Sequence, residues 1–212
     1  MLIFGCWNVR ILQDNKCHIE REIALTAKVT SLHNIDIGPL GKIRHADTGE
    51  LEVGSAADKH LLTFRIPIGN SSFMHLISAY ATTLSAFEQE YNIFYSKLQI
   101  VISKSLYHDK VVLMFCLCVM GKYRTGKMNA SSKFCLIITN TISQHADKYK
   151  NFWKYPRSSN WHMCDCIISK SKDCSDVSLT RAHKTPECYS DHRMVRSKVK
   201  PCTKLNHTQR GH

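Results

Sequence analysis

The stretch that decides the fold class is LLTFRIPIGNSSFMHLISAYA, which runs from Leu61 to Ala81. Leu61–Ile68 and Phe73–Ala81 are rich in β-branched and aromatic residues, as is typical of strands. Gly69–Ser72 between them consists of residues that favour turns, so the two runs predict a β-hairpin. We therefore expect a sheet in the core of the protein.

Strands outnumber helices on both sides of this hairpin. Further strands are predicted at Leu2–Arg10, Asn34–Ile37, Val111–Met120, Phe134–Thr139, Trp161–Ser169, Asp176–His183 and Met194–Val199. One helix is predicted at His18–Leu32, and a second along the stripe Phe87, Tyr91, Phe94, Leu98 and Val101, which marks one helical face. Many strands with few helices favour an α+β sandwich whose helices lie outside the sheets.

The charge of the chain is strongly basic and uneven. The formal net charge is +12, and residues 148–212 hold 14 Lys and Arg against 5 Asp and Glu. A positive field of this kind favours a polyphosphate partner through counterion release, so nucleic acid is the leading partner class. An anionic membrane surface is the second, and a basic tail that only keeps the chain in solution is the alternative to both.

The length of the chain and the composition of its segments predict the number of domains and the cellular location. A chain of 212 residues fits one domain with a core of its own. The longest apolar run, Val111–Met120, has about half the roughly 20 residues that a membrane-spanning helix needs, so we expect no membrane insertion. Met1 leads directly into the strand-like Leu2–Trp7, which predicts no secretory signal and an intracellular location, the nucleus included. The ten cysteines are then expected to pack as small apolar residues.

Five segments, in this order, resemble the endonuclease domain of craniofacial development protein 2-like sequences, which derive from non-LTR retrotransposons of the RTE type. The segments are Trp7–Arg10; Asn34–Ile37; Leu61–Ile68 with Ile77–Ala81; Ile138–Thr141; and Tyr155–His162 leading into Asp165, followed by Ser190–Arg193. The resemblance implies the DNase I-like class of endonucleases, exonucleases and phosphatases. Its fold is a four-layer αββα sandwich, here truncated.

The resemblance also implies a domain organisation. The endonuclease-like domain would span residues 1–200, with contractions between Gly54 and Leu61 and between Gly121 and Phe134. A basic tail over residues 201–212 is expected to be disordered. Gly121–Lys133 is polar, holds two glycines and shows no period, which indicates a loop or the remains of a deletion.

Members of this family cleave a DNA phosphodiester by Mg²⁺-assisted attack of water. On the family's motif, Asp165 is the carboxylate that pairs with the catalytic histidine, and His192 is that histidine. Asp191 matches a carboxylate of the metal and nucleophile site. Asn8 matches the first-strand asparagine that helps to order the active site and to bind the metal, and Tyr80 matches a tyrosine whose hydroxyl contacts the phosphate. A buried carboxylate in this role fixes the tautomer of the imidazole.

Four arginines lie in or beside the matched segments and are expected to contact nucleic acid. They are Arg10, Arg44, Arg157 and Arg193. Arginine is suited to this task because its planar guanidinium binds phosphate through two parallel hydrogen bonds.

The departures from the family pattern fall on its metal site. Lys42 stands near the position of the metal-binding Glu, and Phe115–Cys118 replaces a Gly-Asp-Phe-Asn motif, so that Cys116 and Cys118 stand where the family has Asp and Asn. Mg²⁺ prefers oxygen ligands. Reversal of one charge at a close pair costs roughly 4 kcal/mol near a protein surface, enough to empty a weak site. The cofactor is thus Mg²⁺ if the chain is active, and we expect none to be bound.

Three functions follow from these observations. The first is an active phosphodiesterase that uses Asp165, Asp191 and His192. The second is a catalytically inactive remnant that binds nucleic acid through its basic C-terminal third. The third is a transposon-derived fragment with no selected function and no stable fold. The sequence favours a degenerate endonuclease without activity.

Overall fold

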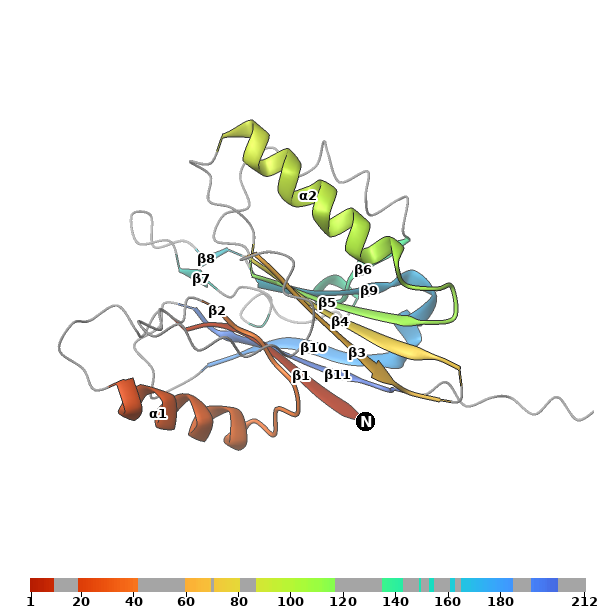
Figure 1. The fold of residues 1–212 in the computed structure, drawn as a ribbon. Coiled ribbons are helices and arrows are strands. Elements are labelled where there is room, and N and C mark those ends of the chain that lie inside the picture. The colour runs from red at the N-terminus through yellow and green to blue at the C-terminus, as the bar shows by residue number, and fades with distance from the viewer. Residues whose placement is uncertain are drawn as a thin grey trace, which may run out of the picture.

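Two β-sheets stacked face to face form the centre of the molecule, with one helix on the outside of each (Figure 1). This computed structural model describes residues 1–9, 19–41, 60–69, 71–80, 87–116, 135–142, 149, 153–154, 161–162, 165–184 and 192–201. The predictions for Gly121–Lys133, for the contracted segments and for all of the tail except Pro201 lie outside these residues. Among the described helices, none has the length and apolar character needed to cross a membrane.

The five-stranded sheet is built around the predicted hairpin. Its strand order is β3-β4-β5-β9-β6, with bounds Leu61–Pro67, Phe73–Tyr80, Lys110–Cys116, Asp165–Lys170 and Leu136–Ile138. β3 and β4 pair antiparallel, with Leu61 opposite Ala79, which confirms the hairpin. Helix α2, Glu88–Ser103, connects β4 to its parallel neighbour β5.

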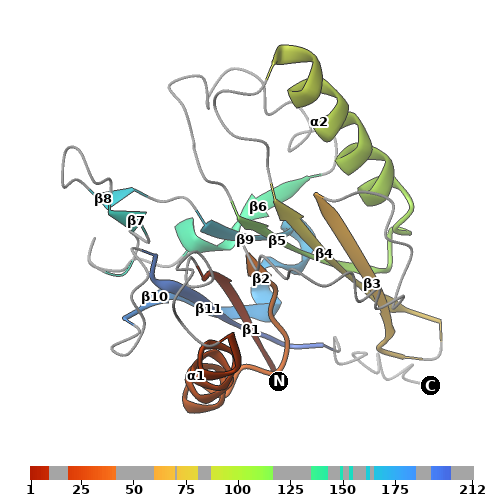
Figure 2. The ribbon, with the colours of Figure 1, turned by 60° about the vertical axis from the view of Figure 1, so that its left-hand side comes forward.

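The four-stranded sheet joins the two ends of the chain. Its order is β10-β11-β1-β2, with bounds Val177–His183, Met194–Val199, Leu2–Asn8 and Leu40–Gly41. β1 lies between β11, with which it is antiparallel, and β2, with which it is parallel. Helix α1, Ile19–Leu32, lies outside this sheet, on the side away from α2 (Figures 1 and 2). A short pair, β7 at Trp153–Lys154 and β8 at Trp161–His162, lies beside one end of the sandwich.

Three apolar clusters separate the four layers. The cluster between the sheets consists of Phe4, Cys6, Met74, Leu76, Val112, Met114, Ile167, Ala182, Val195 and Val199. Under α2, Phe94, Leu98 and Ile102 pack on the other face of the five-stranded sheet. Under α1, Val29 packs with Trp7, Val9 and Met194. Within the stripe predicted on α2, Phe94 and Leu98 are core and Val101 packs against it, whereas Phe87 before the first turn is 79 % exposed. The predicted four-layer αββα sandwich is confirmed.

The prediction of a strand at Asn34–Ile37 is wrong. An isolated bridge joins Ile37 to Phe4, and the strand on the side of β1 away from β11 is the two-residue β2. Asp36 explains the interruption, because its carboxylate Oδ2 accepts a hydrogen bond of 2.8 Å from the Ile3 amide, a donor that a regular strand would bond through its backbone. Asn34 also has a positive φ of 50°, which ends the α1 region by a turn.

Candidate functional site

Asp165 and His192 form a buried pair at one end of the sandwich. Asp165 begins β9 and is fully buried, and His192, two residues before β11, is 3 % exposed. The imidazole Nδ1 lies 3.1 Å from the carboxylate Oδ2 of Asp165. A carboxylate can only accept this hydrogen bond, so Nδ1 carries the proton and the ring is held in one orientation. The structure thus brings together the two residues that the sequence pairs.

Asn8, at the end of β1, faces the other nitrogen of the same ring. Its amide Nδ2 lies 3.4 Å from His192 Nε2, and its side chain is fully buried. The register of β1 and β11 pairs Cys6 with Val195, which brings the end of β1 beside the residues that precede β11. Next to Asn8, the indole Nε1–H of Trp7 donates to the carbonyl of His192 over 3.3 Å. The first strand therefore fixes both the backbone and the ring of His192.

Trp153 is a neighbour of this site that the sequence does not reveal. It makes a β-bridge with His192, and the two rings stack with their centroids 5.9 Å apart and their planes at 26°. The stack limits rotation of the imidazole about its side-chain bonds. No motif or periodicity marks Trp153 in advance, because its place depends on the pairing of β7 with β8.

Asn140 holds the backbone on which Asp165 stands. It lies in the 3-10 turn Thr139–Thr141, is 2 % exposed, and spans β9 with two hydrogen bonds. Its Nδ2 donates to the carbonyl of Asp165 over 3.1 Å, and its Oδ1 accepts from the amide of Ile167 over 3.2 Å. Asn140 belongs to the matched segment Ile138–Thr141, which was the available signal, but its role as a positioning residue comes from the structure.

The ends of three neighbouring strands meet beside the Asp165 carboxylate. Strand pairing sets Tyr80 of β4 opposite Cys116 of β5, and Cys116 opposite Asp165 of β9. The Tyr80 ring packs partly against the apolar cluster between the sheets, and its backbone exchanges hydrogen bonds of 2.9 and 3.0 Å with His60. Cys116, which the sequence resemblance sets at the position of a family Asp, therefore ends the strand next to β9.

The remaining predicted site residues divide into two groups. Arg193 follows His192 and is partly buried, and this burial lowers the pKa of its guanidinium from the usual value. Arg10, Lys42, Arg44, Cys118, Arg157 and Asp191 lie outside the described residues. Their expected roles in metal or nucleic-acid binding stay predictions.

The donor set in the described part of the site does not suit Mg²⁺. Mg²⁺ favours an octahedral set of oxygen ligands, with carboxylates and water as the usual donors. Within the described residues, no three or more His, Cys, Asp or Glu side chains gather closely enough to hold a metal ion. The Asp165 carboxylate is engaged by His192, and the residue at the end of β5 is a cysteine.

The chain is similar in fold to several solved structures, at low sequence identity. No family model and no curated protein sequence matches it. The endonuclease domain of TRAS1, a telomere-specific non-LTR retrotransposon, matches with a TM-score of 0.64 at 9 % identity, over 94 % of this chain and 99 % of that one. The 3′ phosphatase NExo from Neisseria, solved with a product DNA hairpin, matches with a TM-score of 0.65 at 10 % identity, over 94 % and 100 % of the two chains.

A third solved structure has a similar fold. D. rerio TDP2, solved with a single-strand DNA product, matches with a TM-score of 0.62 at 10 % identity, over 94 % of this chain and 98 % of that one. At such low identity the likeness shows the fold. The fold of this chain is the α+β sandwich of the DNase I-like class.

Proposed function

We propose that this chain is a descendant of an RTE-type, craniofacial development protein 2-like Mg²⁺-dependent DNA endonuclease, and that it binds the phosphodiester backbone of nucleic acid without hydrolysing it. The observation that carries the proposal is the His192 ring held between Asp165 and Asn8, at 3.1 Å and 3.4 Å. Residues from β1, β9 and the segment before β11 build this arrangement, and such convergence of polar groups is typical of a binding site.

The chemistry of the three side chains suits a phosphate oxygen. Asp165 holds the Nδ1–H of the ring, so Nε2 is the nitrogen left to face a phosphate. When Nε2 carries a proton, it and the Asn8 amide are two donors 3.4 Å apart, close enough to bind one phosphate oxygen. The basic C-terminal third of the chain adds the long-range attraction that draws a polyanion to this end.

The same site lacks what hydrolysis needs. Cleavage of a phosphodiester requires neutralisation of developing charge and an oriented water, which this class obtains from carboxylates around Mg²⁺. Cys116 ends the strand next to Asp165, and the sequence has Lys42 near the position of the family's metal-binding Glu. Both changes remove oxygen ligands. The proposal therefore assigns no cleavage step to this chain.

Binding is tested with a labelled DNA duplex and the purified chain over a range of salt concentrations. We expect the logarithm of the association constant to fall linearly with the logarithm of salt concentration. His192→Ala should weaken binding about 10-fold or more, as expected when a charge-assisted hydrogen bond is lost. His108→Ala is the matched control, since the His108 side chain is 50 % exposed on the segment between α2 and β5. Equal affinity of the two variants would contradict the proposed site.

Hydrolysis is tested by Mg²⁺-dependent nicking of a plasmid and of an abasic duplex. We expect the natural chain and His192→Ala to be equally inactive. The double variant Lys42→Glu with Cys116→Asp returns two carboxylates to the site and should produce measurable nicking that depends on His192. Nicking by the natural chain that His192→Ala abolishes would instead establish the second candidate, an active Mg²⁺-dependent endonuclease, which the intact Asp165–His192 pair favours.

A further inference from the structure

Arg181 and Arg196 face each other across β10 and β11. They are register partners, as are their neighbours Ala182 and Val195. Ala182 and Val195 belong to the apolar cluster between the sheets, so the two arginines point to the opposite, outer face. Side chains directly opposite in an antiparallel pair lie about 5 Å apart at Cβ, and like charges in that position repel. The natural sequence retains this repulsive pair.

Two histidines complete the group on the outer face. Arg181 Nε donates to His183 Nε2 over 3.2 Å, and Arg196 Nε donates to the carbonyl of His33 over 2.9 Å. The rings of His33 and His183 meet edge to face with their centroids 5.1 Å apart. Arg181, Arg196, His33 and His183 are called the outer-face cluster below.

Little negative charge balances the outer-face cluster. In the described part of the chain, neither Arg181 nor Arg196 forms an ion pair, and each uses only Nε for the hydrogen bonds given above. Asp36 is the acidic group that acts on Arg196: burial and the charge of Arg181 lower the pKa of the Arg196 guanidinium, and Asp36 raises it. The Asp36 carboxylate is already bonded to the Ile3 amide.

The histidines respond to this positive field. Burial, followed by the charges of Arg181, His33 and Arg196, lowers the pKa of His183 to about 4. Burial and the charge of Arg196 lower the pKa of His33. Both rings are therefore neutral at neutral pH, and His183 accepts rather than donates at Nε2. Two charged guanidinium groups and two neutral imidazoles therefore lie together on this face.

We propose that the outer-face cluster is a binding site for a phosphate group of a nucleic-acid strand, separate from the Asp165–His192 site. The terminal nitrogens of two opposed guanidiniums can each donate two hydrogen bonds to one phosphate. Lys198 of β11 and the Tyr149 ring, 6.0 Å from the Arg181 guanidinium carbon, lie at its border. Only the choice of a nucleic acid as the source of the phosphate rests on the proposed function.

The position of the cluster in the fold supports this source. β10 is the edge strand of the four-stranded sheet, and β11 begins two residues after His192 (Figure 2). Arg196 lies four residues beyond His192, which corresponds to roughly 13 Å along a strand. An extended nucleic-acid strand bound at His192 would therefore need to span only this short distance, around the edge formed by β10, to reach the cluster.

Binding of an anion must be linked to protons. A phosphate offsets the charges of Arg181 and Arg196 and so raises the pKa of His183 and of His33 in the bound state. Protons are then taken up on binding, and affinity increases as the pH falls from 8 through the bound-state pKa toward the value of the free protein. The charged groups that act on the two histidines are Arg181 and Arg196, with Lys198 two residues further along β11 and Asp36 acting on Arg196.

The test follows the histidine ring signals by NMR while inorganic phosphate, and then a short single-stranded DNA, is added at pH 6 and at pH 8. We expect both ligands to shift the ring signals of His33 and His183 but not those of His108. The affinity for the DNA, whose phosphodiesters keep one negative charge at both pH values, should be at least threefold higher at pH 6. Arg181→Gln and Arg196→Gln should abolish the shifts. Each removes a repulsion together with one hydrogen bond, so unfolding in urea is measured for both variants and should change little. Arg65→Gln, on β3 in the other sheet, is the matched control.

Several outcomes decide between the possibilities. Equal shifts in Arg181→Gln and Arg65→Gln, or no shifts at either pH, would overturn the inference. Tighter binding to vesicles of anionic lipid than to DNA would also overturn it, since it would identify a membrane surface. Repetition in a His192→Ala background separates the two sites. Shifts at the cluster that persist while DNA binding is insensitive to His192 would refute the proposed function and leave this inference standing.

Discussion

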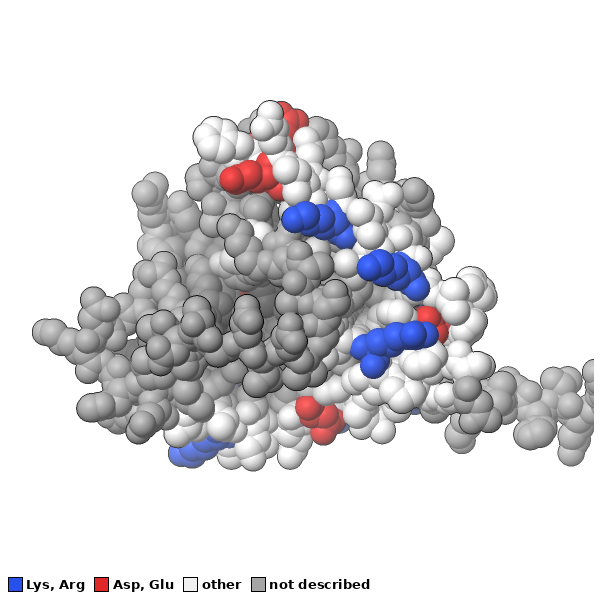
Figure 3. Space-filling model, in the orientation of Figure 1, with Lys and Arg blue, Asp and Glu red and all other residues white. Residues whose placement is uncertain are grey.

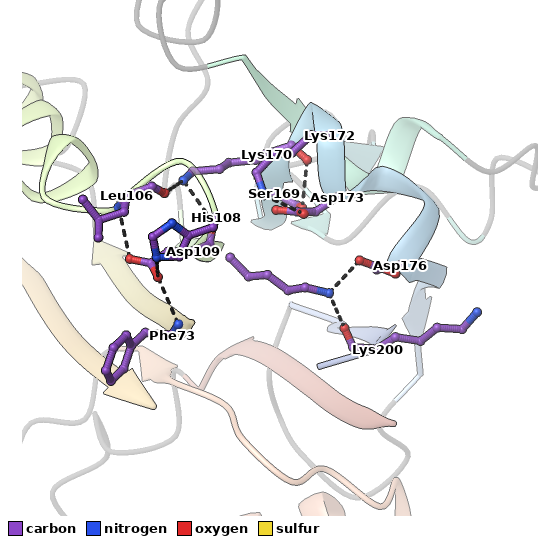
Figure 4. A network of polar contacts seen from close by, with 11 residues as sticks. Phe73, Leu106, His108, Asp109, Ser169, Lys170, Lys172, Asp173, Asp176 and Lys200 are labelled. Atoms are coloured by element: carbon purple, nitrogen blue, oxygen red, sulfur yellow. Dashed lines mark hydrogen bonds and ion pairs between the residues drawn. The ribbon is translucent and has the colours of Figure 1, made fainter. Parts of the chain in front are cut away.

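Asp109 shows at the scale of one residue how the end of the sandwich opposite the candidate site is held. Its carboxylate accepts hydrogen bonds from the amide of Phe73 at 3.0 Å, the amide of Leu106 at 3.1 Å and His75 Nε2 at 2.9 Å. Phe73 begins β4, and Leu106 and Asp109 lie between α2 and β5, so one buried side chain joins this segment to β4 (Figure 4). Lys170 Nζ adds bonds to the carbonyls of Leu106 and Asp109.

The ionisation of Asp109 predicts acid sensitivity. Burial alone would raise the pKa of this carboxyl, but the hydrogen bonds from Phe73, His75 and Leu106, with the charge of His75, lower it to about 2. A pKa depressed from 3.8 contributes about 2 kcal/mol to the free energy of unfolding above pH 4, and this is lost as the pH falls toward 2. Urea unfolding at pH 7, 4 and 2.5 measures the loss.

The variant Asp109→Asn isolates this contribution. An amide has one acceptor oxygen in place of two, so at least one donor at this site is left without its bond, and we expect destabilisation of about 1–3 kcal/mol at pH 7. The difference from the natural chain should shrink at pH 2.5, where the carboxyl begins to protonate. Glu90→Gln on the exposed face of α2 is the control and should change stability little at any pH. A constant difference across this range would contradict the assigned pKa.

At the scale of an element, Asn140 helps to hold β9 in place. With Thr139, whose hydroxyl donates to the carbonyl of Ile167 over 2.8 Å, it attaches the turn Thr139–Thr141 to β9. The Thr180 hydroxyl lies 2.9 Å from that of Thr139 and 2.7 Å from that of Ser197. This chain of buried hydroxyls links β9 of one sheet to β10 and β11 of the other, and so fixes the strand that holds Asp165 relative to the strand that follows His192.

We expect Asn140→Ala to lower the free energy of unfolding by about 2–4 kcal/mol, because two buried backbone groups of β9 lose their bonds together. DNA binding should weaken in the folded variant as well, because Asp165 is no longer held. Thr141→Ala on the exposed end of the same turn is the control, with an expected change within about 0.5 kcal/mol. The measurements are chemical unfolding and duplex binding. Equal stability of the two variants would show that the turn does not support β9.

The sequence predicts a strand or helix well when its residues alone show the hydrophobic period of that element. The Leu61–Ala81 hairpin and the α2 stripe appear in the structure within one or two residues of their predicted bounds. β11 has the predicted bounds Met194–Val199. The run Trp161–Ser169, by contrast, divides into β8 and β9, which pair with different partners. A two-residue strand has too few positions to show a period, so such pieces are defined only by tertiary pairing.

Some residues of the candidate site could be predicted from the sequence, and others depend on how the strands pair. Asp165, His192 and Asn8 were expected to meet because a family motif places them, and composition alone would not have joined them across 184 residues. Trp153 and the outer-face arginines carry no such motif. Their roles depend on strand register, which sets Arg181 against Arg196 and Trp153 against His192. Register is a property of the assembled sheet.

At the scale of the whole molecule, positive charge is distributed unevenly between faces and between parts of the chain. On the face shown in Figure 3, the described Lys and Arg side chains are spread from α2 toward the sheet below it, with acidic side chains among them. The basic excess of the chain belongs to residues 148–212, which include β9, β10 and β11. Attraction of a polyanion should therefore depend more on these strands than on α2.

The whole molecule is closed by its first and last strands. β1 pairs with β11 from Leu2 opposite Val199 to Cys6 opposite Val195, and Phe4 and Val195 are fully buried between the sheets. The cluster between the sheets draws on strands from both sheets, so loss of β11 would expose β1 and one face of β4 and β5 together. Interactions that join the ends of a chain make folding all-or-none, since no part of this core is complete without the last strand.

We therefore expect one cooperative unfolding transition, with the same urea midpoint by far-ultraviolet circular dichroism and by tryptophan fluorescence, which reports on the buried Trp7. A chain that ends at residue 191 lacks His192 and β11 and should show no transition. Asn206→Ala, in the C-terminal segment beyond β11, is the control and should unfold like the natural chain. A gradual loss of signal without a midpoint in the natural chain would favour the third hypothesis, a transposon-derived fragment without a stable fold. The reason is that a sandwich whose two sheets share one core cannot unfold strand by strand.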